Sequence, residues 1–333
     1  MRRAEVEVWR GATVESVHRV SVAVVDVEGR LRASAGDPGF VAVARSAVKP
    51  IQAVPVVEDG VADRFAFSER ELALCCASHS GEASHVELAC SMLRRIGVGE
   101  EALVCGAHEP MHAQSADALR AAGHPPRQVH NNCSGKHIGM LALAVAHGWP
   151  VAGYERADHP VQARLLGALA SWTGVAADEI PIAVDGCGVI TYALPLHRLA
   201  RAFAAFAAGA RAGDATPRRI VRAMVQRPEY VGGTGRLCTE LMRAVRGRIF
   251  AKGGAEGVYC AGIPGAELGI ALKVEDGANR AAEPALIGVL RALGLLSNDE
   301  MMWLAEFAEP DVKNTRWESV GRIRALIDLE VRP

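Results

Sequence analysis

Strand-like sequence lies at both ends of this chain, and helix-like sequence fills the region between them. Residues 6–43 contain valine-rich runs that are broken at Glu28-Gly29, and a Glu-Gly break between two such runs is typical of a β-hairpin. Strand-like runs return in residues 248–277, ahead of a helix predicted over 284–295. Because strands from both ends can share one sheet, the sequence predicts a mainly antiparallel sheet with helices beside and over it, which is an α+β fold.

The region from 50 to 245 is predicted to be mainly helical and to be inserted between the two groups of strands. Its apolar residues recur with helical spacing, and each period ends at a glycine or a polar break. The clearest such segments are SERELALCCAS, EASHVELACSMLRRIG, GKHIGMLALAVAHG, HPVQARLLGALASWTG and LHRLARAFAAFAAG. We therefore predict a single domain over residues 1–333, although length alone would also allow two.

The composition is that of a globular protein that acts on a small molecule. Hydrophobic residues make up 50% of the 333 residues, so the chain can bury a large core. The formal net charge is −1, and no long cluster of lysine and arginine occurs. Neither a nucleic acid nor an anionic membrane is therefore expected as the main partner.

The sequence carries no sign of export or of membrane insertion. Its first residues, MRRAEVEVWRG, are charged and lack the apolar stretch of a signal peptide. No apolar run reaches the length of about 18 residues that a spanning helix needs, and we expect a cytoplasmic location. The eight cysteines are then expected to be core thiols, metal ligands or reactive groups, with Cys75 and Cys76 in the core.

A hydroxyl and an amine lie three residues apart in the segment ARSAVKPIQ. On a first helical turn Ser46 and Lys49 share one face, so Lys49 is placed to take the proton of the Ser46 hydroxyl. A lysine base must be desolvated or lie near other cations, because its ordinary pKa of about 10.4 keeps it protonated at neutral pH. Arg45 supplies a cation, and Pro50 fits a first helical turn. The motif predicts a serine–lysine acyl-transfer pair; the alternative is a capping serine beside a solvated lysine.

Two later blocks, SHSGE and KGG, supply further polar groups. Ser78 is a second candidate hydroxyl, with Ser80 as the alternative, although the block also fits a glycine turn followed by a helix cap. The predicted sheet brings Lys252 near the helix that follows the first strands. Gly253 and Gly254 would let the backbone approach a ligand and offer oxyanion-hole N–H groups, as would the glycines of VGGTG. Tight turns are the alternative explanation for these glycines.

Two cysteines and a lysine form a third candidate group. CSGK puts Cys133 and Lys136 on one helical turn, and DGCG adds Cys187 with Asp185 from elsewhere in the chain. Two thiolates suit Zn²⁺, whereas an amine is an uncommon third ligand that must be deprotonated to bind. The C-x-x-K spacing alone has little of the specificity of C-x-x-C.

Three of these elements resemble the serine β-lactamase and penicillin-binding family, in which S-x-x-K opens a helix and K-[TS]-G lies on a late strand. Here they read SAVK, SHSG and KGG, so the middle block lacks S-D-N and the last lacks a hydroxyl. The sequence more closely resembles bacterial asparaginases of the inducible, thermolabile Rhizobium type. The resemblance extends over nearly the whole chain, in five blocks in the same order: ARSAVKPIQ, CASHSGE, HNNCSGKHIGML, DGCGVITYALPL and KGGAEGVYCAGIP.

This resemblance implies a fold similar to that of glutaminases and β-lactamases. It also implies a homodimer that hydrolyses the side-chain amide of L-asparagine to aspartate and ammonia. The implied catalytic pairs are Ser46 with Lys49 and Ser78 with Lys252. One serine would attack the amide carbon while the other passes a proton to the departing ammonia, and which serine attacks stays open.

The resemblance further implies one zinc ion per chain on Cys133, Lys136 and Cys187. Such an ion would polarise or recognise the substrate carboxylate rather than generate the nucleophile. The charges of asparagine also need partners, and Arg45 is the candidate for its carboxylate and Asp185 for its ammonium group. We include among the candidate substrate-binding residues His79, Gly253 and Gly254. The motif blocks also contain four histidines, His79, His85, His130 and His137. A single histidine of this kind is more often structural than catalytic.

Three alternatives compete with an asparaginase that uses a serine–lysine mechanism. A β-lactamase or D-Ala-D-Ala acyl-transfer enzyme would share the Ser-Lys chemistry, but its substrates lie outside the cytoplasm. A non-enzymatic sensor of zinc or of a small ligand would use only the Cys-Lys-Cys group. Asparaginases with a threonine nucleophile carry T-G-G-T near the N-terminus, whereas here GGT occurs only at 232–234.

Overall fold

The computed structural model describes residues 4–332, and the chain forms two compact units. The first comprises Met1–Ala47, Leu194–Ala208 and Glu240–Pro333, and we call it the sheet unit. The second comprises Val48–Ala193 and Gly209–Thr239, and we call it the helical unit.

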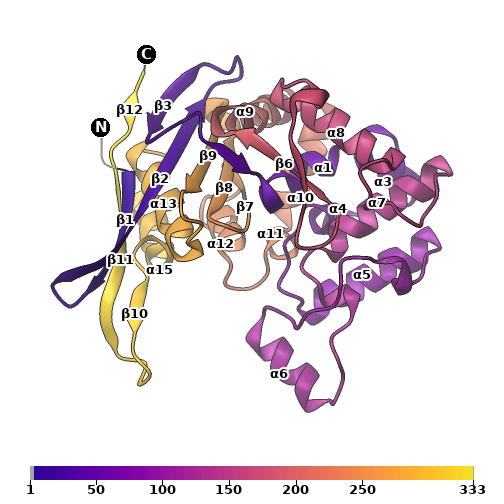
Figure 1. Cartoon of the computed structure of the whole chain (residues 1–333), viewed down its shortest axis with the longest axis horizontal. Coiled ribbons are helices and arrows are strands. Elements are labelled where there is room, and N and C mark those ends of the chain that lie inside the picture. The colour runs from indigo at the N-terminus through magenta and orange to yellow at the C-terminus, as the bar shows by residue number, and fades with distance from the viewer. Residues whose placement is uncertain (1–3, 333) are drawn as a thin grey trace. The chain divides into compact units, whose positions relative to one another are not determined.

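A single antiparallel sheet organises the sheet unit, and both ends of the chain contribute strands to it (Figure 1). Its main path follows the order β10-β11-β1-β2-β9-β8-β7, and β3 pairs with both β2 and β12. The strands are β1 (Ala4–Arg10), β2 (Thr13–Val25), β3 (Leu31–Ala35), β7 (Phe250–Gly253), β8 (Val258–Ile263), β9 (Leu268–Val274), β10 (Asp311–Lys313), β11 (Ser319–Ile327) and β12 (Glu330–Val331). The strand β2 lies between β1 and β9, which confirms the predicted sheet from both termini.

Helices pack on this sheet at positions where glycine leaves room for them. A Cβ added at Gly269 in β9 would lie 1.9 Å from the carbonyl oxygen of Ala200, in the first turns of α9 (Leu196–Ala212). Gly288 in α13 (Asn279–Ala292) similarly faces the Ala325 side chain of β11, at 3.1 Å from an added Cβ. At Gly269 the two backbones therefore approach more closely than a residue with a side chain would permit, whereas a side chain at Gly288 would only be tightly packed.

The helical unit is built around α7 (Ser134–His147). Residues 134–144 of α7 are all buried, as expected for a helix that is apolar on most of its circumference, and α7 contacts α2, α4, α5 and α8. The helix ends at Gly148, whose φ of 68° is the left-handed conformation typical of a helix C-terminus. The remaining helices are α1 (Lys49–Gln52), α2 (Val54–Glu58), α3 (Val61–Arg64), α4 (Glu69–Cys75), α5 (Ala83–Ile96), α6 (Ala113–Ala121), α8 (Pro160–Thr173), α10 (Ala215–Gln226), α11 (Pro228–Val231) and α12 (Leu237–Ala244), which extends beyond this unit.

Several short elements differ from the sequence-based expectation. The mainly helical region contains β5 (Ile182–Val184) and β6 (Ile190–Pro195), and β4 (Val41–Val43) precedes it. All three residues of β5 are exposed, so the strand has no alternation of apolar and polar residues to reveal it. After α13, which begins before the predicted start at Pro284, the chain forms α14 (Asn298–Trp303), α15 (Ala305–Ala308) and the last three strands.

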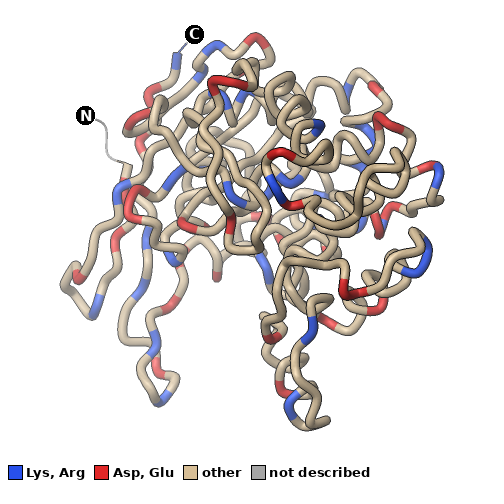
Figure 2. The backbone as a smooth tube through the Cα atoms, turned by 45° about the vertical axis from the view of Figure 1, so that its right-hand side comes forward, with Lys and Arg blue, Asp and Glu red and all other residues tan. Residues whose placement is uncertain are grey.

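Basic and acidic residues are interspersed along the backbone of each unit (Figure 2). Many of them form surface ion pairs within one unit, such as Arg120 with Glu109 at 2.7 Å and Arg248 with Glu300 at 2.6 Å. Within residues 4–332, none of the helices combines the length and the apolar character that crossing a bilayer demands.

Candidate active site

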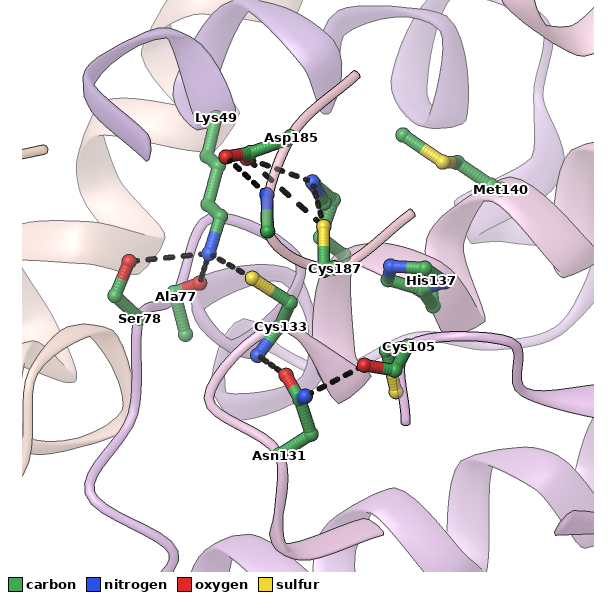
Figure 3. A network of polar contacts seen from close by, with 12 residues as sticks. Lys49, Ala77, Ser78, Cys105, Asn131, Cys133, His137, Met140, Asp185 and Cys187 are labelled. Carbon is green, nitrogen blue, oxygen red and sulfur yellow. Dashed lines mark hydrogen bonds and ion pairs between the residues drawn. The ribbon is translucent and has the colours of Figure 1, made fainter. Parts of the chain in front are cut away.

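The amine of Lys49 lies at the centre of a buried polar network in the helical unit (Figure 3). Lys49 opens α1, directly after the 3₁₀ turn Arg45–Val48, and its side chain is 0% exposed. Its Nζ lies 2.6 Å from the carbonyl oxygen of Ala77, 3.0 Å from the Oγ of Ser78 and 3.1 Å from the Sγ of Cys133. The amine therefore connects a candidate nucleophilic hydroxyl with a candidate metal ligand.

A second amine and a second thiol continue the network from Cys133. Lys136 Nζ donates to the Sγ of Cys187 at 3.1 Å and lies 3.9 Å from Oδ2 of Asp185. Asp185 accepts from the backbone N–H of Gly186 at 2.8 Å, which fixes the carboxylate at the turn before Cys187. The structure thus brings together six predicted site residues within the helical unit, namely Lys49, Ser78, Cys133, Lys136, Asp185 and Cys187.

The two thiols have opposite acidities because one donates to the other. The hydrogen bond from Cys187 lowers the pKa of Cys133 well below the usual range of a thiol, and the ammonium groups of Lys49 and Lys136 act in the same direction against burial. The same hydrogen bond raises the pKa of Cys187, and burial adds to that rise. Burial acts to lower the pKa of Lys136, but the negative charges around it, that of Cys133 first, outweigh burial and raise the pKa.

Asn131 holds the start of α7 in place, and the sequence analysis did not identify it as a site residue. Its Oδ1 accepts from the backbone N–H of Cys133 at 2.8 Å, and its Nδ2 donates to the carbonyl oxygens of Cys105 and Gly106. This is the side-chain-to-backbone pattern typical of asparagine two residues before a turn. An Asn-x-Cys spacing just ahead of a helix was the signal in the sequence.

His79 is a buried structural group in this unit, with both ring nitrogens engaged. Its Nδ1 accepts from the backbone N–H of Gly81 at 3.1 Å, so Nε2 carries the proton and donates to the Oγ of Ser134 at 2.8 Å. The side chain is 0% exposed. Burial, with the positive charges of His85 and Lys49, holds the pKa of His79 well below the usual range. His79 links the Ser78 loop to α7 and presents no ring nitrogen to a ligand.

The other motif histidines also bond within the protein. His85 Nδ1 accepts from the backbone N–H of Glu82 at 3.1 Å, and His130 Nδ1 accepts from that of Arg127 at 2.9 Å. His137 contacts the hydroxyl of Tyr154 at 2.5 Å.

The remaining predicted residues lie in the sheet unit. Arg45 and Ser46 are half-buried in the 3₁₀ turn, and the φ of Arg45 is 49°. Lys252 lies at 1% exposure in β7, with Nζ 2.7 Å from the carbonyl oxygen of Gly253. A Cβ on Gly254 would lie 3.1 Å from the Ala44 carbonyl oxygen. The KGG block therefore packs against the turn that carries Ser46, as the predicted sheet requires.

The thiols of the described residues are all free, and Cys75 and Cys76 are buried as expected. Between residues 4 and 332, no three side chains of His, Cys, Asp or Glu are grouped so that they would hold a metal ion. A metal at Cys133 and Cys187 would therefore need Lys136 as a third protein ligand.

Two solved structures, both of a protein called Mglu, are similar to this chain. One is of its native form in 4.3 M NaCl; the alignment has a TM-score of 0.38 and 18% identity over 85% of this chain. The other has a TM-score of 0.35 and 19% identity over 85% of this chain. This chain spans 63% of the length of the first and 69% of the second. At this level of similarity neither structure bears on activity.

No curated protein is similar enough to count as a relative. The L-asparaginase II family model, in contrast, matches residues 6–325. This match covers nearly the whole chain and every residue of the network. The chain therefore belongs to the L-asparaginase II family.

Proposed function

We propose that this protein is an L-asparaginase that hydrolyses the side-chain amide of L-asparagine by serine–lysine acyl transfer. The observation that carries the proposal is the contact of 3.0 Å between the buried amine of Lys49 and the hydroxyl of Ser78. A lysine amine removed from water and aimed at a hydroxyl is the arrangement that activates a serine. Family membership supports the amide as the substrate.

Three contacts fix the position of the Lys49 amine. Its Nζ donates to the carbonyl oxygen of Ala77 at 2.6 Å, to the Oγ of Ser78 at 3.0 Å and to the Sγ of Cys133 at 3.1 Å. The amine is therefore held next to the Ser78 hydroxyl. To act as a base, it would have to be in its neutral form when it takes the proton of a serine.

We assign Ser46 as the nucleophile and Ser78 as the proton relay. Ser46 precedes Lys49 by three residues, and that assignment rests on the spacing and on the family resemblance. Lys49 would take the proton of the Ser46 hydroxyl during attack on the amide carbon. Ser78, hydrogen-bonded to Lys49, would pass a proton to the departing ammonia, with Lys252 as the second amine. Water would then hydrolyse the acyl-enzyme and regenerate the serine.

For substrate recognition we keep Arg45 for the carboxylate of asparagine and Asp185 for its ammonium group. The backbone of Gly253 and Gly254 would border the ligand. We do not keep His79, because both of its ring nitrogens already bond within the protein. His79 instead positions the Ser78 loop.

The donor atoms of Cys133, Lys136 and Cys187 fit a zinc ion. The sulfur of Cys187 lies 3.1 Å from the Lys136 amine, and the sulfur of Cys133 lies 3.1 Å from the Lys49 amine. Two thiolates and an amine are acceptable zinc ligands and leave a fourth position open. Bound there, zinc would act as a Lewis acid toward a carboxylate or carbonyl oxygen. The chain's own groups would still orient the substrate and move the protons.

The proposal is tested by ammonia release from asparagine, glutamine and a chromogenic β-lactam. We expect turnover of asparagine. Lys49→Met, which keeps the volume of the side chain, should lower kcat by about 10²–10⁴-fold because it removes the base. Ser46→Ala and Lys252→Met should also lower kcat by orders of magnitude, since members of one catalytic unit are individually essential. The matched control is Lys313→Met in the exposed strand β10, which should leave kcat unchanged.

Three outcomes would contradict parts of this proposal. Turnover near the wild-type rate in Lys49→Met would exclude Lys49 as the base. An acyl group trapped by rapid acid quench and found by mass spectrometry on Ser78 rather than Ser46 would reverse the two serine roles. Hydrolysis of the β-lactam without release of ammonia from asparagine would show that the enzyme acts on β-lactams and not on asparagine.

We further propose that the active form is a homodimer and that the chain acts as one asparaginase domain. Light scattering should then give a particle mass twice the 35.2 kDa of the chain.

A further inference from the structure

The loop that carries Ser78 is bound along its length by a second loop of the helical unit. We call the second loop, residues 231–235, the glycine loop; it follows α11. The backbone N–H of Ser78 donates to the carbonyl oxygen of Val231 at 3.0 Å. Two residues later the Ser80 hydroxyl donates to the carbonyl oxygen of Gly232 at 3.0 Å. Ser78 therefore owes its backbone position partly to a segment that is remote in the sequence.

On the exposed side of the two loops, the carboxylate of Glu82 binds the glycine loop. Glu82 accepts from the backbone N–H of Thr234 at 2.7 Å and from the Thr234 hydroxyl at 3.0 Å, with one carboxylate oxygen for each. Thr234 is exposed, whereas Ser78 and Ser80 are buried. Hydrogen bonds to an ionised acceptor are stronger than neutral ones, so the two bonds of Glu82 add to the bonds that the carbonyl oxygens of Val231 and Gly232 accept from the Ser78 loop.

The geometry of Gly233 shows that the two loops fit tightly. Its φ is 110°, a conformation that residues with a side chain rarely adopt. A Cβ at this position would lie 2.6 Å from the Oγ of Ser80 and 2.7 Å from Oε1 of Glu82. Glycine at 233 thus allows the carboxylate of Glu82 and the hydroxyl of Ser80 to reach their partners on either side of it.

We propose that Glu82 is a positioning residue, which acts on the reaction by holding the glycine loop against the Ser78 loop. Glu82 itself does not enter the network of Lys49. Its two bonds to Thr234 keep the carbonyl oxygens of Val231 and Gly232 in place. These in turn hold Ser78 so that its hydroxyl lies 3.0 Å from the Lys49 amine. This inference rests on the proposed role of the Lys49–Ser78 contact in catalysis.

The test is steady-state kinetics of Glu82→Ala, Thr234→Val and the double variant with asparagine. Glu82→Ala should lower kcat by about 10- to 100-fold with KM changed less than about threefold, because a displacement near 1 Å costs that much in rate. Thr234→Val keeps the backbone N–H and should cost less. The double variant should be no slower than Glu82→Ala, since Glu82→Ala already removes the hydroxyl bond that Thr234→Val removes. The matched control is Glu87→Gln, which changes an exposed carboxylate of α5, the helix that begins directly after Glu82. It should have wild-type kinetics.

A second readout separates failure of this inference from failure of the proposed function. Hydrogen exchange in the Glu82→Ala variant should speed up at the amides of Ser78 and Thr234, while the amides of α7 keep their protection. Faster exchange together with a lower kcat supports the inference. Wild-type kcat in Glu82→Ala while Lys49→Met is inactive overturns it and leaves the serine–lysine mechanism intact. Unchanged exchange at Ser78 overturns it whatever the enzyme hydrolyses.

Discussion

Burial decides what the individual side chains of the candidate site can do. Lys49 has no exposed surface and Lys136 is 4% exposed, yet each has a thiol and an oxygen acceptor within reach. Cations removed from water are costly unless they are paired and hydrogen-bonded. Lys49 donates to the Sγ of Cys133 and Lys136 donates to the Sγ of Cys187. After Cys187, the charges of both lysines help to hold the pKa of Cys133 low.

Buried histidines predict how the stability depends on pH. Burial is the largest cause that lowers the pKa of His79 and of His85. Below a pH of about 6.5 the unfolded chain protonates both residues, whereas the folded protein does so only below the lowered pKa values. The free energy of unfolding should therefore fall as the pH falls below about 6.5, by up to about 1.4 kcal/mol per pH unit for each histidine. Urea unfolding across this pH range measures the effect.

A variant without the fully buried histidine isolates its contribution. His79→Gln removes the titration and should flatten the pH dependence of the free energy of unfolding. His124→Gln, at an exposed position, should leave the dependence as in the wild type. The same slope in His79→Gln and in the wild type would show that His79 does not contribute.

At the scale of elements, glycine positions determine how closely helices approach the sheet. Gly269 of β9 lies under α9, and an added Cβ would be 1.9 Å from the Ala200 carbonyl oxygen and 2.4 Å from the Ala204 nitrogen. Both are backbone atoms, which cannot turn away as a side chain does. The contact fixes the helix on the sheet that also carries Lys252.

Gly269→Ala should therefore destabilise the sheet unit by about 1–3 kcal/mol or more, the usual cost of overpacking. The measurement is urea unfolding followed by circular dichroism. Gly265→Ala provides the control in the connection between β8 and β9, because an added Cβ there has nothing within 4 Å. Equal stability of the two variants would contradict the proposed packing of α9 on β9.

At the scale of the molecule, the candidate metal ligands all belong to the helical unit. Cys133 and Lys136 lie at the start of α7, and Cys187 lies in the turn between β5 and β6. A ligand that binds only the folded state stabilises it in proportion to its affinity and concentration. Zinc would thus connect two segments that are 54 residues apart in the chain, counted from 133 to 187.

We expect purified protein to contain up to about one zinc ion per chain, and Cys133→Ser and Cys187→Ser to lose it because hydroxyl groups are poor zinc ligands. Metal analysis measures the content.

Removal of zinc should increase hydrogen exchange in α7 and in residues 185–188 and leave the amides of β2 and β9 unchanged. If the metal serves recognition, its removal should raise KM more than it lowers kcat. Cys90→Ser, at a half-buried thiol in α5, is the control. Protein that stays free of metal after expression with zinc would end this proposal.

The sequence by itself determined the architecture and most of the residue types of the site. Strand-like runs at both ends and glycine-terminated helical periods between them are local patterns, and β1, β2, β9 and α7 follow them. The motif blocks could be identified in the sequence for the same reason, and they contain Ser46, Ser78, Cys133, Cys187 and Lys252. Each consists of neighbouring residues whose side chains have recognisable chemistry.

Only the tertiary structure decided which of these groups meet. No spacing indicates that Lys49 bonds to Ser78 and Cys133, because these residues come from separate segments of the chain. The structure also showed that His79 and Asn131 support the site from within the protein. Exposed β5 escaped prediction because its three apolar residues are too short a run to indicate a strand, and its pairing with β6 makes it one. Local pattern reflects the period of the backbone, whereas contacts between distant segments depend on how the whole chain packs.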